Sequence, residues 1–524
     1  MLVPRFAACF WCFANFDSPA VNAGATLSSS GSSRRRKPTQ MRISSGRAGF
    51  PVWAERRGAG SSSAARWSFS VIPPDKRAPC RGYKDRALPR AQHTAGERMA
   101  VLLDLTRCCR CSPGASLLQE ADSHVFLLCG AERDRRENGL WDPSPGSHRS
   151  VHVLDSGSTA ERLYRLKRTL DELDLSAVRV LTTARGREVL ARYQETLFTA
   201  VYTFNYDVTQ TDKVTCSDCC GSAHTDSPEG DAEEEVSAFL QQLPALKGDI
   251  RTLRSTLIPD CFGHGFSTRS GGVSYIPTLS SLNLFSSSRR RDPRAVVEEN
   301  RRRLAVHAGF HPIPLRLVKV NHASDVWVLG KPEPESYDSM VTDQTGVVLA
   351  GQGADCLPIL FADPVKKVIG AAHAGWRGTL MGVATATVDA MVTNFGCRYG
   401  DIVVAVGPSV GVCCFTLDRE QAADFISIHP DCVPDPESAK PHVDILLANR
   451  VLLQQRGVLP EHIHDNTETT RPPVTPCTSC NPDDFFSHVR DGINFGTQVG
   501  FLWIKESGEQ AGAPESQTGQ QGGP

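Results

Sequence analysis

The chain has 524 residues, of which 40% are hydrophobic and 22% are charged, and its formal net charge is −1. This length has room for roughly two or three domains, and the balanced charge excludes a chain-wide basic surface for nucleic acid. No run of about 18 uninterrupted apolar residues occurs, so we predict no transmembrane helix.

Residues 1–98 differ in composition from the rest of the chain. They are rich in Arg, Ser, Gly, Ala and Pro, contain few acids and show no sustained helix or strand period, so we expect a disordered leader. The same composition fits a mitochondrial transit peptide. Met99, however, precedes a strand-like run and looks like a natural start. This favours an extended or alternative start over a targeting signal.

Residues 99–208 have the pattern of a small α/β domain. Strands are predicted at Val101–Leu105, His124–Cys129, Ala177–Thr182 and Ala200–Tyr206. Two amphipathic helices lie between them: one follows a capping-box pattern formed by Ser158 and Glu161, and the other spans 185–198. No catalytic constellation occurs in this domain, so we predict that it docks a protein partner.

A polar linker is predicted at 209–235. It contains an acidic run and a Cys-x-x-Cys pair at Cys216 and Cys219. The comparable pair, Cys477 and Cys480, is far away in sequence, so we interpret the linker cysteines as unligated rather than as half of a zinc site. The 18 cysteines include adjacent pairs that are unlike a secreted disulfide scaffold, which indicates reduced thiols in an intracellular protein.

Residues 236–506 have a continuously globular pattern, and 507–524 are predicted to form a disordered tail. Helices are predicted at 236–243, 292–309, 378–395 and as a pair within 419–456. Strands are predicted to end near Phe266 and to cover most of 315–329, which contains His322, as well as 401–407 and 499–504.

One stretch of this core carries the strongest local signal. Asp363 and the following proline form a turn signal between two apolar runs, which predicts an antiparallel hairpin with Asp363 paired to Lys366. In that register Cys356 lies opposite His373 on the same face, where opposed Cβ atoms are roughly 5 Å apart. This spacing suits two ligands of one metal ion, and it equally suits a buried structural cysteine beside a core histidine.

Several motifs of the core resemble a known family when they are taken together. They are Gly265-Phe-Ser-Thr-Arg-Ser-Gly-Gly-Val-Ser-Tyr275, Ser281-Leu-Asn-Leu284, the His322 segment, Ala354-Asp-Cys-Leu-Pro358, His373-Ala-Gly-Trp-Arg-Gly378, Gly407-Pro-Ser-Val-Gly411 and Phe485-Phe-Ser-His-Val-Arg-Asp-Gly492. In order and spacing, they resemble the laccase-domain family, once called multicopper polyphenol oxidoreductases. An N-terminal α/β unit ahead of this core is similar to animal members of the family.

The resemblance implies a fold, an activity and a metal site. The fold is a layered α/β sandwich, and the metal ligands fall on His322, Cys356 and His373. The activity is phosphorolysis of the purine nucleosides adenosine, inosine and methylthioadenosine with inorganic phosphate, together with deamination of adenosine. The family's animal members also imply a part in purine metabolism and in the metabolic control of immune cells.

The residue types agree with such a metal site. Two histidines and one cysteine leave the fourth position of a zinc ion open, as catalysis requires, and a zinc ion in such a site can activate water at neutral pH. Zinc is therefore the expected cofactor, and the same ligand set also suits a single copper ion. Cys356 could instead act as a nucleophile with His373 as its base.

The phosphate and the sugar of such substrates need polar partners. Arg377, four residues after His373, is the first candidate for phosphate, and Arg269 and Arg490 lie in Gly-adjacent turns that could expose them. Each of these arginines could instead form a structural ion pair. Asn283 could bond a ribose hydroxyl or simply hold a turn.

Two other functions stay open. A copper-dependent polyphenol oxidoreductase could use the same three ligands, but a multicopper relay needs several His-x-His pairs and the core offers His462 and His464 alone. A non-catalytic metabolic scaffold would not need an intact ligand set. No clear signal peptide or retrieval signal occurs, so we expect the cytoplasm, with the nucleus or peroxisome allowed by the resemblance and mitochondria less favoured.

Overall fold

The computed structural model describes residues 99–106, 123–129, 150–155, 157–209, 231–467 and 470–506. All of them belong to one compact unit of the chain, residues 85–524. The predicted leader and tail, and most of the predicted linker with Cys216 and Cys219, lie outside the described residues. Within the described part of the chain, no helix is long and apolar enough to cross a membrane.

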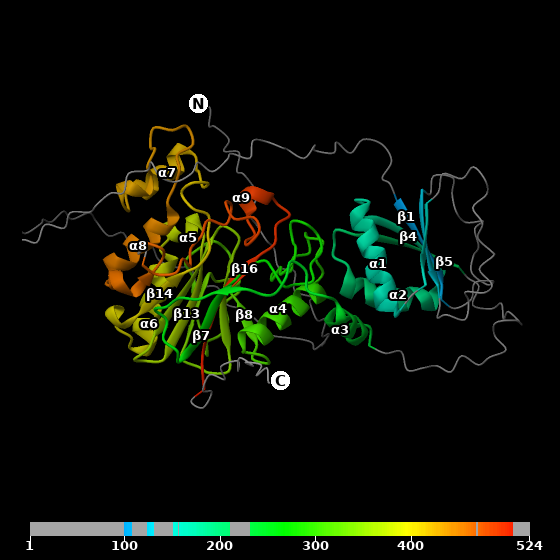
Figure 1. The fold of residues 1–524 in the computed structure, drawn as a ribbon, viewed down its shortest axis with the longest axis horizontal. Coiled ribbons are helices and arrows are strands. Elements are labelled where there is room, and N and C mark those ends of the chain that lie inside the picture. Colours follow the sequence, from blue (N-terminus) through cyan, green and yellow to red (C-terminus); the bar gives the residue numbers. More distant parts are fainter. Residues whose placement is uncertain are drawn as a thin grey trace, which may run out of the picture. The chain divides into compact units, whose positions relative to one another are not determined.

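The N-terminal domain is built on a parallel five-stranded sheet with the strand order β3-β2-β1-β4-β5. Its strands are β1 (Met99–Leu105), β2 (His124–Cys129), β3 (Ser150–Leu154), β4 (Ala177–Thr183) and β5 (Thr203–Thr209). Helices α1 (Thr159–Glu172) and α2 (Ala184–Leu197) follow β3 and β4, and both pack against the same apolar face of the sheet (Figure 1). The sequence missed β3, a short edge strand with little buried surface.

The starts of two helices show how local sequence sets their boundaries. The hydroxyl of Ser158 accepts a hydrogen bond from the backbone N–H of Glu161 at 3.2 Å, so the predicted capping residue does begin α1. Helix α3 (Ala232–Gln242) begins inside the predicted linker, which is therefore shorter than predicted. Asp231 caps α3 and three glutamates fill its first turn, where acidic side chains stabilise the unpaired N–H groups of a helix.

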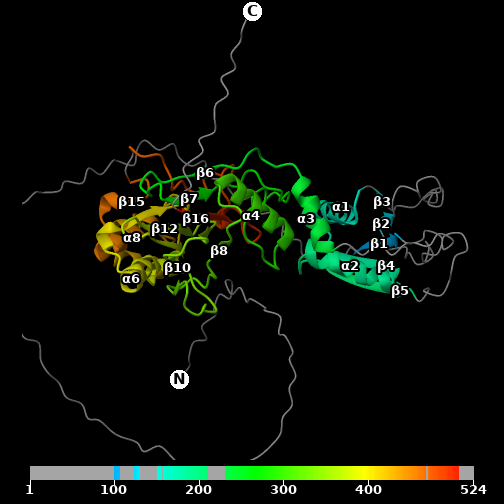
Figure 2. The same ribbon diagram turned by 90° about the horizontal axis from the view of Figure 1, so that it is seen from below.

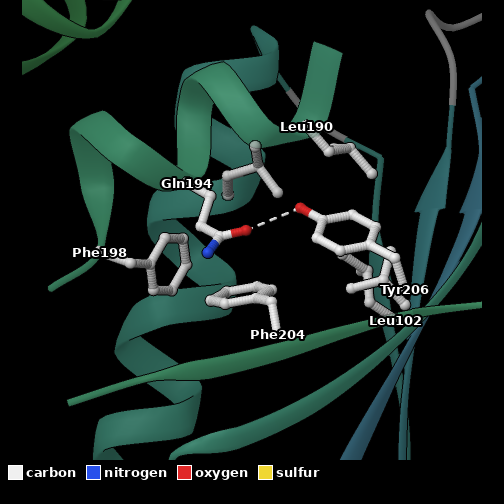
Figure 3. Close-up of a pocket in the computed structure, with 8 residues that line it drawn as sticks. Leu102, Leu190, Gln194, Phe198, Phe204 and Tyr206 are labelled. Carbon is white, nitrogen blue, oxygen red and sulfur yellow. Dashed lines mark hydrogen bonds between the residues drawn. The ribbon is translucent and has the colours of Figure 1, made fainter. Parts of the chain in front are cut away.

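A small pocket lies inside the N-terminal domain, between its helices and its sheet (Figure 3). Its labelled lining residues are Leu102, Leu190, Gln194, Phe198, Phe204 and Tyr206. One polar pair crosses it, in which the Tyr206 hydroxyl donates to Gln194 Oε1 at 2.8 Å. Because the rest of the lining is apolar, we interpret the pocket as a gap in the packing rather than as a binding site.

The C-terminal core contains two sheets packed face to face. Their strand orders are β15-β14-β12-β13-β10-β9 and β6-β7-β16-β11-β8. The strands are β6 (Thr252–Leu253), β7 (Phe262–Ser267), β8 (Leu315–Leu317), β9 (Val326–Val328), β10 (Ser339–Thr342), β11 (Val348–Gly353), β12 (Leu357–Asp363), β13 (Val368–Ala374), β14 (Val403–Val406), β15 (Ile463–His464) and β16 (Gln498–Ile504). Strands β11 and β16 contact β12 and β13 across the interface, and all four are fully buried.

Helices cover the outer faces of the two sheets. Helix α6 (Val383–Phe395), backed by α8 (Ile445–Arg456), packs on the first sheet, and α4 (Arg294–Ala308) packs on the second (Figures 1 and 2). Three short helices lie in connecting segments: α5 (Trp376–Leu380), α7 (Arg419–Ile426) and α9 (His488–Asp491). The core is thus a layered α/β sandwich, and the predicted fold class is confirmed.

The helix predicted at 378–395 is divided in two. Helix α5 ends at Leu380 and α6 starts at Val383, with Gly382 between them at a φ of 80°. This left-handed conformation is open to glycine and interrupts a helix. The break leaves α5 as a separate turn directly after β13.

The central hairpin forms, but in a register that differs from the predicted one. Strands β12 and β13 are antiparallel, and Asp363 pairs with Val368 rather than with Lys366. The Asp363 carboxylate accepts the backbone N–H groups of Val365 and Lys366 at 2.8 and 2.9 Å, which draws both residues into the turn. The shift is an even number of residues, so each side chain keeps its predicted face. Cys356 lies one residue before β12.

Both domains contribute to a charged cluster around Asp171 of α1. Its carboxylate accepts hydrogen bonds from the Lys167 ammonium at 2.9 Å, the Tyr275 hydroxyl at 2.5 Å and the Arg291 guanidinium at 2.7 Å. The Tyr202 hydroxyl donates to the same carboxylate. Lys167 is fully buried. A buried carboxylate therefore joins side chains from the small domain and from the core.

Candidate metal centre

Three side chains from separate segments of the core meet beside the β12–β13 hairpin. His322 lies between β8 and β9, Cys356 directly precedes β12, and His373 is near the end of β13. Their ligand atoms all lie within 4.8 Å of one another. The two imidazole rings are 5.1 Å apart between centroids and nearly perpendicular, at 87°. The structure therefore brings together the three residues predicted as metal ligands.

His322 lies in a loop, so the strand predicted over 315–329 is wrong at this point. Its φ is 63°, a left-handed conformation that is uncommon for a residue other than glycine. The backbone N–H groups of residues 321–323 all donate to the carboxylate of Asp338, at 3.0 to 3.2 Å. These bonds satisfy the N–H groups that a strand would have paired, and they hold His322 beside the hairpin.

Asp338 also orients His373. Its Oδ1 lies 2.8 Å from His373 Nδ1, and its backbone carbonyl accepts the N–H of His373 at 2.8 Å. Because Nδ1 is occupied, Nε2 is the nitrogen left for a metal, and a carboxylate behind the imidazole is the usual arrangement for such ligands. The pKa of His373 is raised to about 10, since burial opposes protonation but the Cys356 thiolate and Asp338 outweigh it.

The residue before Cys356 fixes its position. Asp355 has a φ of 103°, which is rare for a side chain of this type. Its carboxylate accepts the Thr478 hydroxyl and the Val489 N–H, each at 2.6 Å, and its carbonyl accepts the Val410 N–H at 3.0 Å. Three segments that are distant in sequence thus hold this turn.

The thiol of Cys356 is in surroundings that favour its ionised form. Burial alone would raise the pKa of Cys356, but the charge of His373 and hydrogen bonds from His322 and His373 lower that pKa to about 5. The thiolate is the form of cysteine that binds metal ions. The electrostatics of the cluster therefore agree with metal ligation.

The donor set and the space around it fit a metal ion. Zinc with nitrogen and sulfur ligands at about 2.0–2.3 Å needs donors roughly 3.3–3.8 Å apart, and the donors here lie within 4.8 Å. Gly375 leaves room beside them, because an added Cβ would lie 3.1 Å from Cys356 Sγ and 3.5 Å from His322 Cδ2. Three ligands leave a coordination position open. The same set also suits copper.

Arg377 is exposed on α5, two residues after Gly375. Its guanidinium lies 4.9 Å from the ring centroid of Trp376. Within the described residues it has no hydrogen-bond or ion-pair partner. Its donors are therefore available to a ligand, unlike those of the other two candidate arginines.

Arg269 and Arg490 use their donors within the protein. Arg269 is only 5% exposed, which contradicts the expectation of an exposed turn residue. It donates to three backbone carbonyls at 2.7 to 2.8 Å and lies over the ring of Phe486. Arg490 pairs with Asp491 at 2.7 Å and donates to two carbonyls at 2.8 and 2.9 Å. These contacts agree with the structural alternative for both arginines.

Asn283 is fully buried, and both ends of its amide are bonded to the protein. Its Nδ2 donates to Asp292 Oδ2 at 3.0 Å, and its Oδ1 accepts the Thr497 N–H at 3.1 Å. These bonds link two segments of the core. They favour the turn-holding alternative over a contact with ribose.

Three residues of this centre were not predicted from the sequence: Asp338, Asp355 and Gly375. Asp355 and Gly375 lie inside the family motifs, next to predicted ligands, so their positions could have been noticed. Asp338 directly precedes the short buried strand β10, and an acid before a strand is a weak signal. Its role depends on a loop and a strand that only the folded chain brings to it.

Comparisons with known proteins agree with the motifs. Residues 263–505 match the family model described as multi-copper polyphenol oxidoreductase laccase. A Mus musculus protein named purine nucleoside phosphorylase LACC1 is 51% identical over 350 residues, which cover 66% of this chain and 80% of that protein. The Homo sapiens protein of the same name is 49% identical over 367 residues, which cover 68% of this chain and 82% of that protein.

A prokaryotic relative extends the range of named activities. It is called adenosine deaminase RL5 and is 30% identical over 246 residues, which cover 44% of this chain and 90% of that protein. The mammalian matches cover most of their own length at high identity, and the family model spans the core that holds the three donors. The chain therefore belongs to the laccase-domain family.

Proposed function

We propose that the core is a zinc-dependent purine nucleoside phosphorylase that acts on adenosine, inosine and methylthioadenosine and that also deaminates adenosine. The observation that carries this proposal is the meeting of His322, Cys356 and His373 within 4.8 Å. Relatives named purine nucleoside phosphorylase support the first activity. A relative named adenosine deaminase supports the second.

In this proposal the protein's own residues prepare and hold the centre. Asp338 keeps Nε2 of His373 available by bonding its Nδ1, and it holds the loop of His322. Asp355 keeps Cys356 in place through its bonds to two other segments. A zinc ion held by these three ligands supplies an electrophile and an acidic water at neutral pH.

We assign phosphate binding to Arg377 first. It is exposed, close in sequence to His373, and without a partner in the described residues, and a guanidinium can bond phosphate through two parallel N–H donors. Arg269, Arg490 and Asn283 support the loops of the core in this proposal. Their bonds to backbone carbonyls and to buried side chains leave fewer donors for a substrate.

The proposal is tested with purified protein and each nucleoside, with and without phosphate. When phosphate is present, the expected products are the free base and ribose 1-phosphate, or 5-methylthioribose 1-phosphate from methylthioadenosine. Adenosine should also give inosine and ammonia. His373→Ala should lower kcat/KM at least ~100-fold, since even the residue behind a metal ligand is worth about 10–100-fold. His307→Ala, at an exposed position of α4, is the matched control. Unchanged turnover in the ligand variant would contradict the proposal, as would a metal-loaded protein that forms no product.

A copper-dependent oxidation of phenols is the second candidate, because two histidines and one cysteine also suit copper. Measuring the metal content and the turnover of a phenol on the same preparation separates the two functions. Bound zinc with nucleoside turnover supports the phosphorylase. Bound copper with phenol oxidation, and no nucleoside product, would replace it.

A further inference from the structure

The core holds a second group of metal-binding side chains. Cys413 and Cys414 follow β14, whereas Cys477 and Cys480 precede α9. Their four sulfur atoms all lie within 4.8 Å of one another. The Sγ of Cys480 is 3.5 Å from that of Cys413 and 3.4 Å from that of Cys414. The partners of the Cys477–Cys480 pair therefore come from the core itself.

The spacing of these sulfurs is that of a metal site rather than that of disulfides. None of the four cysteines is in a disulfide, and bonded sulfurs would be only about 2.05 Å apart. A zinc ion with four sulfur ligands at about 2.3 Å has tetrahedral S···S edges of roughly 3.8 Å. Two of the S···S distances, 3.4 and 3.5 Å, are close to that edge, and all four sulfurs lie within 4.8 Å of one another.

The backbone holds the two cysteine segments together before any ion is considered. Ser409 and Cys477 form a parallel β-bridge, and Thr478 N–H donates to the Ser409 carbonyl at 3.0 Å. Gly411 N–H donates to Cys477 Sγ at 3.2 Å. A Cβ on Gly411 would lie 3.3 Å from both Cys413 Sγ and Cys477 Cβ. Glycine at this position lets the thiols approach one another.

We propose that Cys413, Cys414, Cys477 and Cys480 bind a structural zinc ion. Four sulfur ligands complete a tetrahedral site and leave no position for a substrate, which is typical of structural rather than catalytic zinc. The two segments are more than 60 residues apart in sequence, so the ion would act as a cross-link between distant parts of the core.

The position of this proposed cross-link indicates which part of the core it would stabilise. Val410, on one segment, donates its N–H to the Asp355 carbonyl, and Thr478, on the other, donates its hydroxyl to the Asp355 carboxylate. Asp355 precedes Cys356. The four-cysteine site thus braces the turn that presents Cys356, although none of its ligands belongs to the first centre. The proposal does not depend on which reaction the core catalyses.

The test is zinc stoichiometry in the full chain. Protein equilibrated with zinc and then desalted is analysed for metal per chain. Cys413→Ser/Cys480→Ser should bind one zinc ion fewer than the parent, because the four-cysteine site is lost. His373→Ala should also bind one fewer, because the first centre is lost, and the combined variant should bind two fewer. Cys261→Ser, at a partly exposed cysteine outside both groups, should retain the parental stoichiometry.

A second variant separates ligand loss from misfolding. Cys480→His should keep the parental zinc content, because imidazole is also a zinc ligand in structural sites, whereas Cys480→Ser should lower it. Equal zinc content in the parent and the double serine variant would overturn the proposal. A disulfide among the four cysteines in protein isolated without oxidant, detected by mass spectrometry, would also overturn it.

Discussion

Two carboxylates, Asp338 in the core and Asp171 in the N-terminal domain, are almost completely buried, and both have a lowered pKa. Burial alone would raise both values; bonds and charge from His373 lower the first, and the charge of Lys167 with hydrogen bonds from Tyr202, Tyr275 and Arg291 lowers the second. Asp338 mainly accepts backbone N–H groups and one imidazole. Asp171 mainly accepts charged and phenolic side chains.

The difference in partners indicates a difference in role. A carboxylate bonded mainly to backbone N–H groups shapes a loop, and its replacement by an amide removes acceptors from those groups and from one imidazole. A carboxylate that neutralises buried cations cannot lose its charge without leaving those cations unpaired in a poorly solvated place. We therefore expect Asp171 to matter most for stability and Asp338 to matter most for metal binding.

The largest expected effect is that of Asp171→Asn on stability. The change removes the ion-pair partner of Lys167, which is fully buried, and breaking a buried ion pair costs about 3–5 kcal/mol. Urea unfolding of the parent and the variant measures this loss. Asp174→Asn is the control, because Asp174 pairs with the same Arg291 at 2.8 Å but its side chain is 89% exposed. The control should cost below ~1 kcal/mol, and equal losses would remove the distinction.

The next largest expected effect is on the pH dependence of stability, and it comes from the buried histidine His264. His264 on β7 has hydrogen-bond partners in the backbone of Ser255 and Phe262, and burial, helped by the charges of Arg254 and Lys505, lowers its pKa from 6.5 to about 4. The unfolded chain therefore binds more protons than the folded chain between these values. The stabilisation is complete above pH 6.5 and is lost as the pH falls through 4.

This loss should amount to about 2–3 kcal/mol by pH 4.5. The free energy of unfolding of the parent and His264→Gln, measured at pH 7 and pH 4.5, gives the difference attributable to His264. The gap between the two proteins should shrink or reverse as the pH falls. A gap that is independent of pH would show that His264 titrates normally. His307→Gln, at an exposed histidine, should follow the parent at both pH values.

The smallest expected effect is that of Asp338→Asn, and it concerns function rather than folding. The amide would no longer hold His373 in its orientation, so metal affinity and kcat/KM should each fall about 10–100-fold. A competition assay with a chelator measures the first quantity and nucleoside turnover measures the second. Asp343→Asn, at an exposed acid just after β10, is the control. A loss confined to stability, with metal affinity intact, would place Asp338 in the same class as Asp171.

Much of the fold could be predicted from sequence because its signals are local. The capping residue Ser158, the strands β1 and β2, and the buried strand β16 follow from short patterns of polar and apolar residues. The predicted hairpin register is wrong, because the Asp363 carboxylate accepts two backbone N–H groups of the turn. Cys356 and His373 still lie on the same face of the sheet, since a register shift by an even number of residues preserves the faces of both strands.

The remaining parts of the site depend on contacts between distant segments. His322 was expected in a strand, and only the bonds to Asp338, 16 residues further on, explain the loop that contains it. The burial and hydrogen-bond partners of Arg269 and Asn283 could not be predicted from the sequence either. A residue type indicates which bonds a side chain can make, but partners such as Pro482 and Thr497 lie more than 200 residues away.

The apolar cluster at the boundary of the two domains has a consequence for dissecting the protein. Val273 and Val296 of the core are buried in the same cluster as Leu163 and Leu170 of α1. A fragment cut between the domains would expose this shared surface and would also leave Tyr275 and Arg291 without Asp171. The two domains are separate in sequence but should unfold cooperatively. We therefore expect a single thermal unfolding transition for the N-terminal domain and the core.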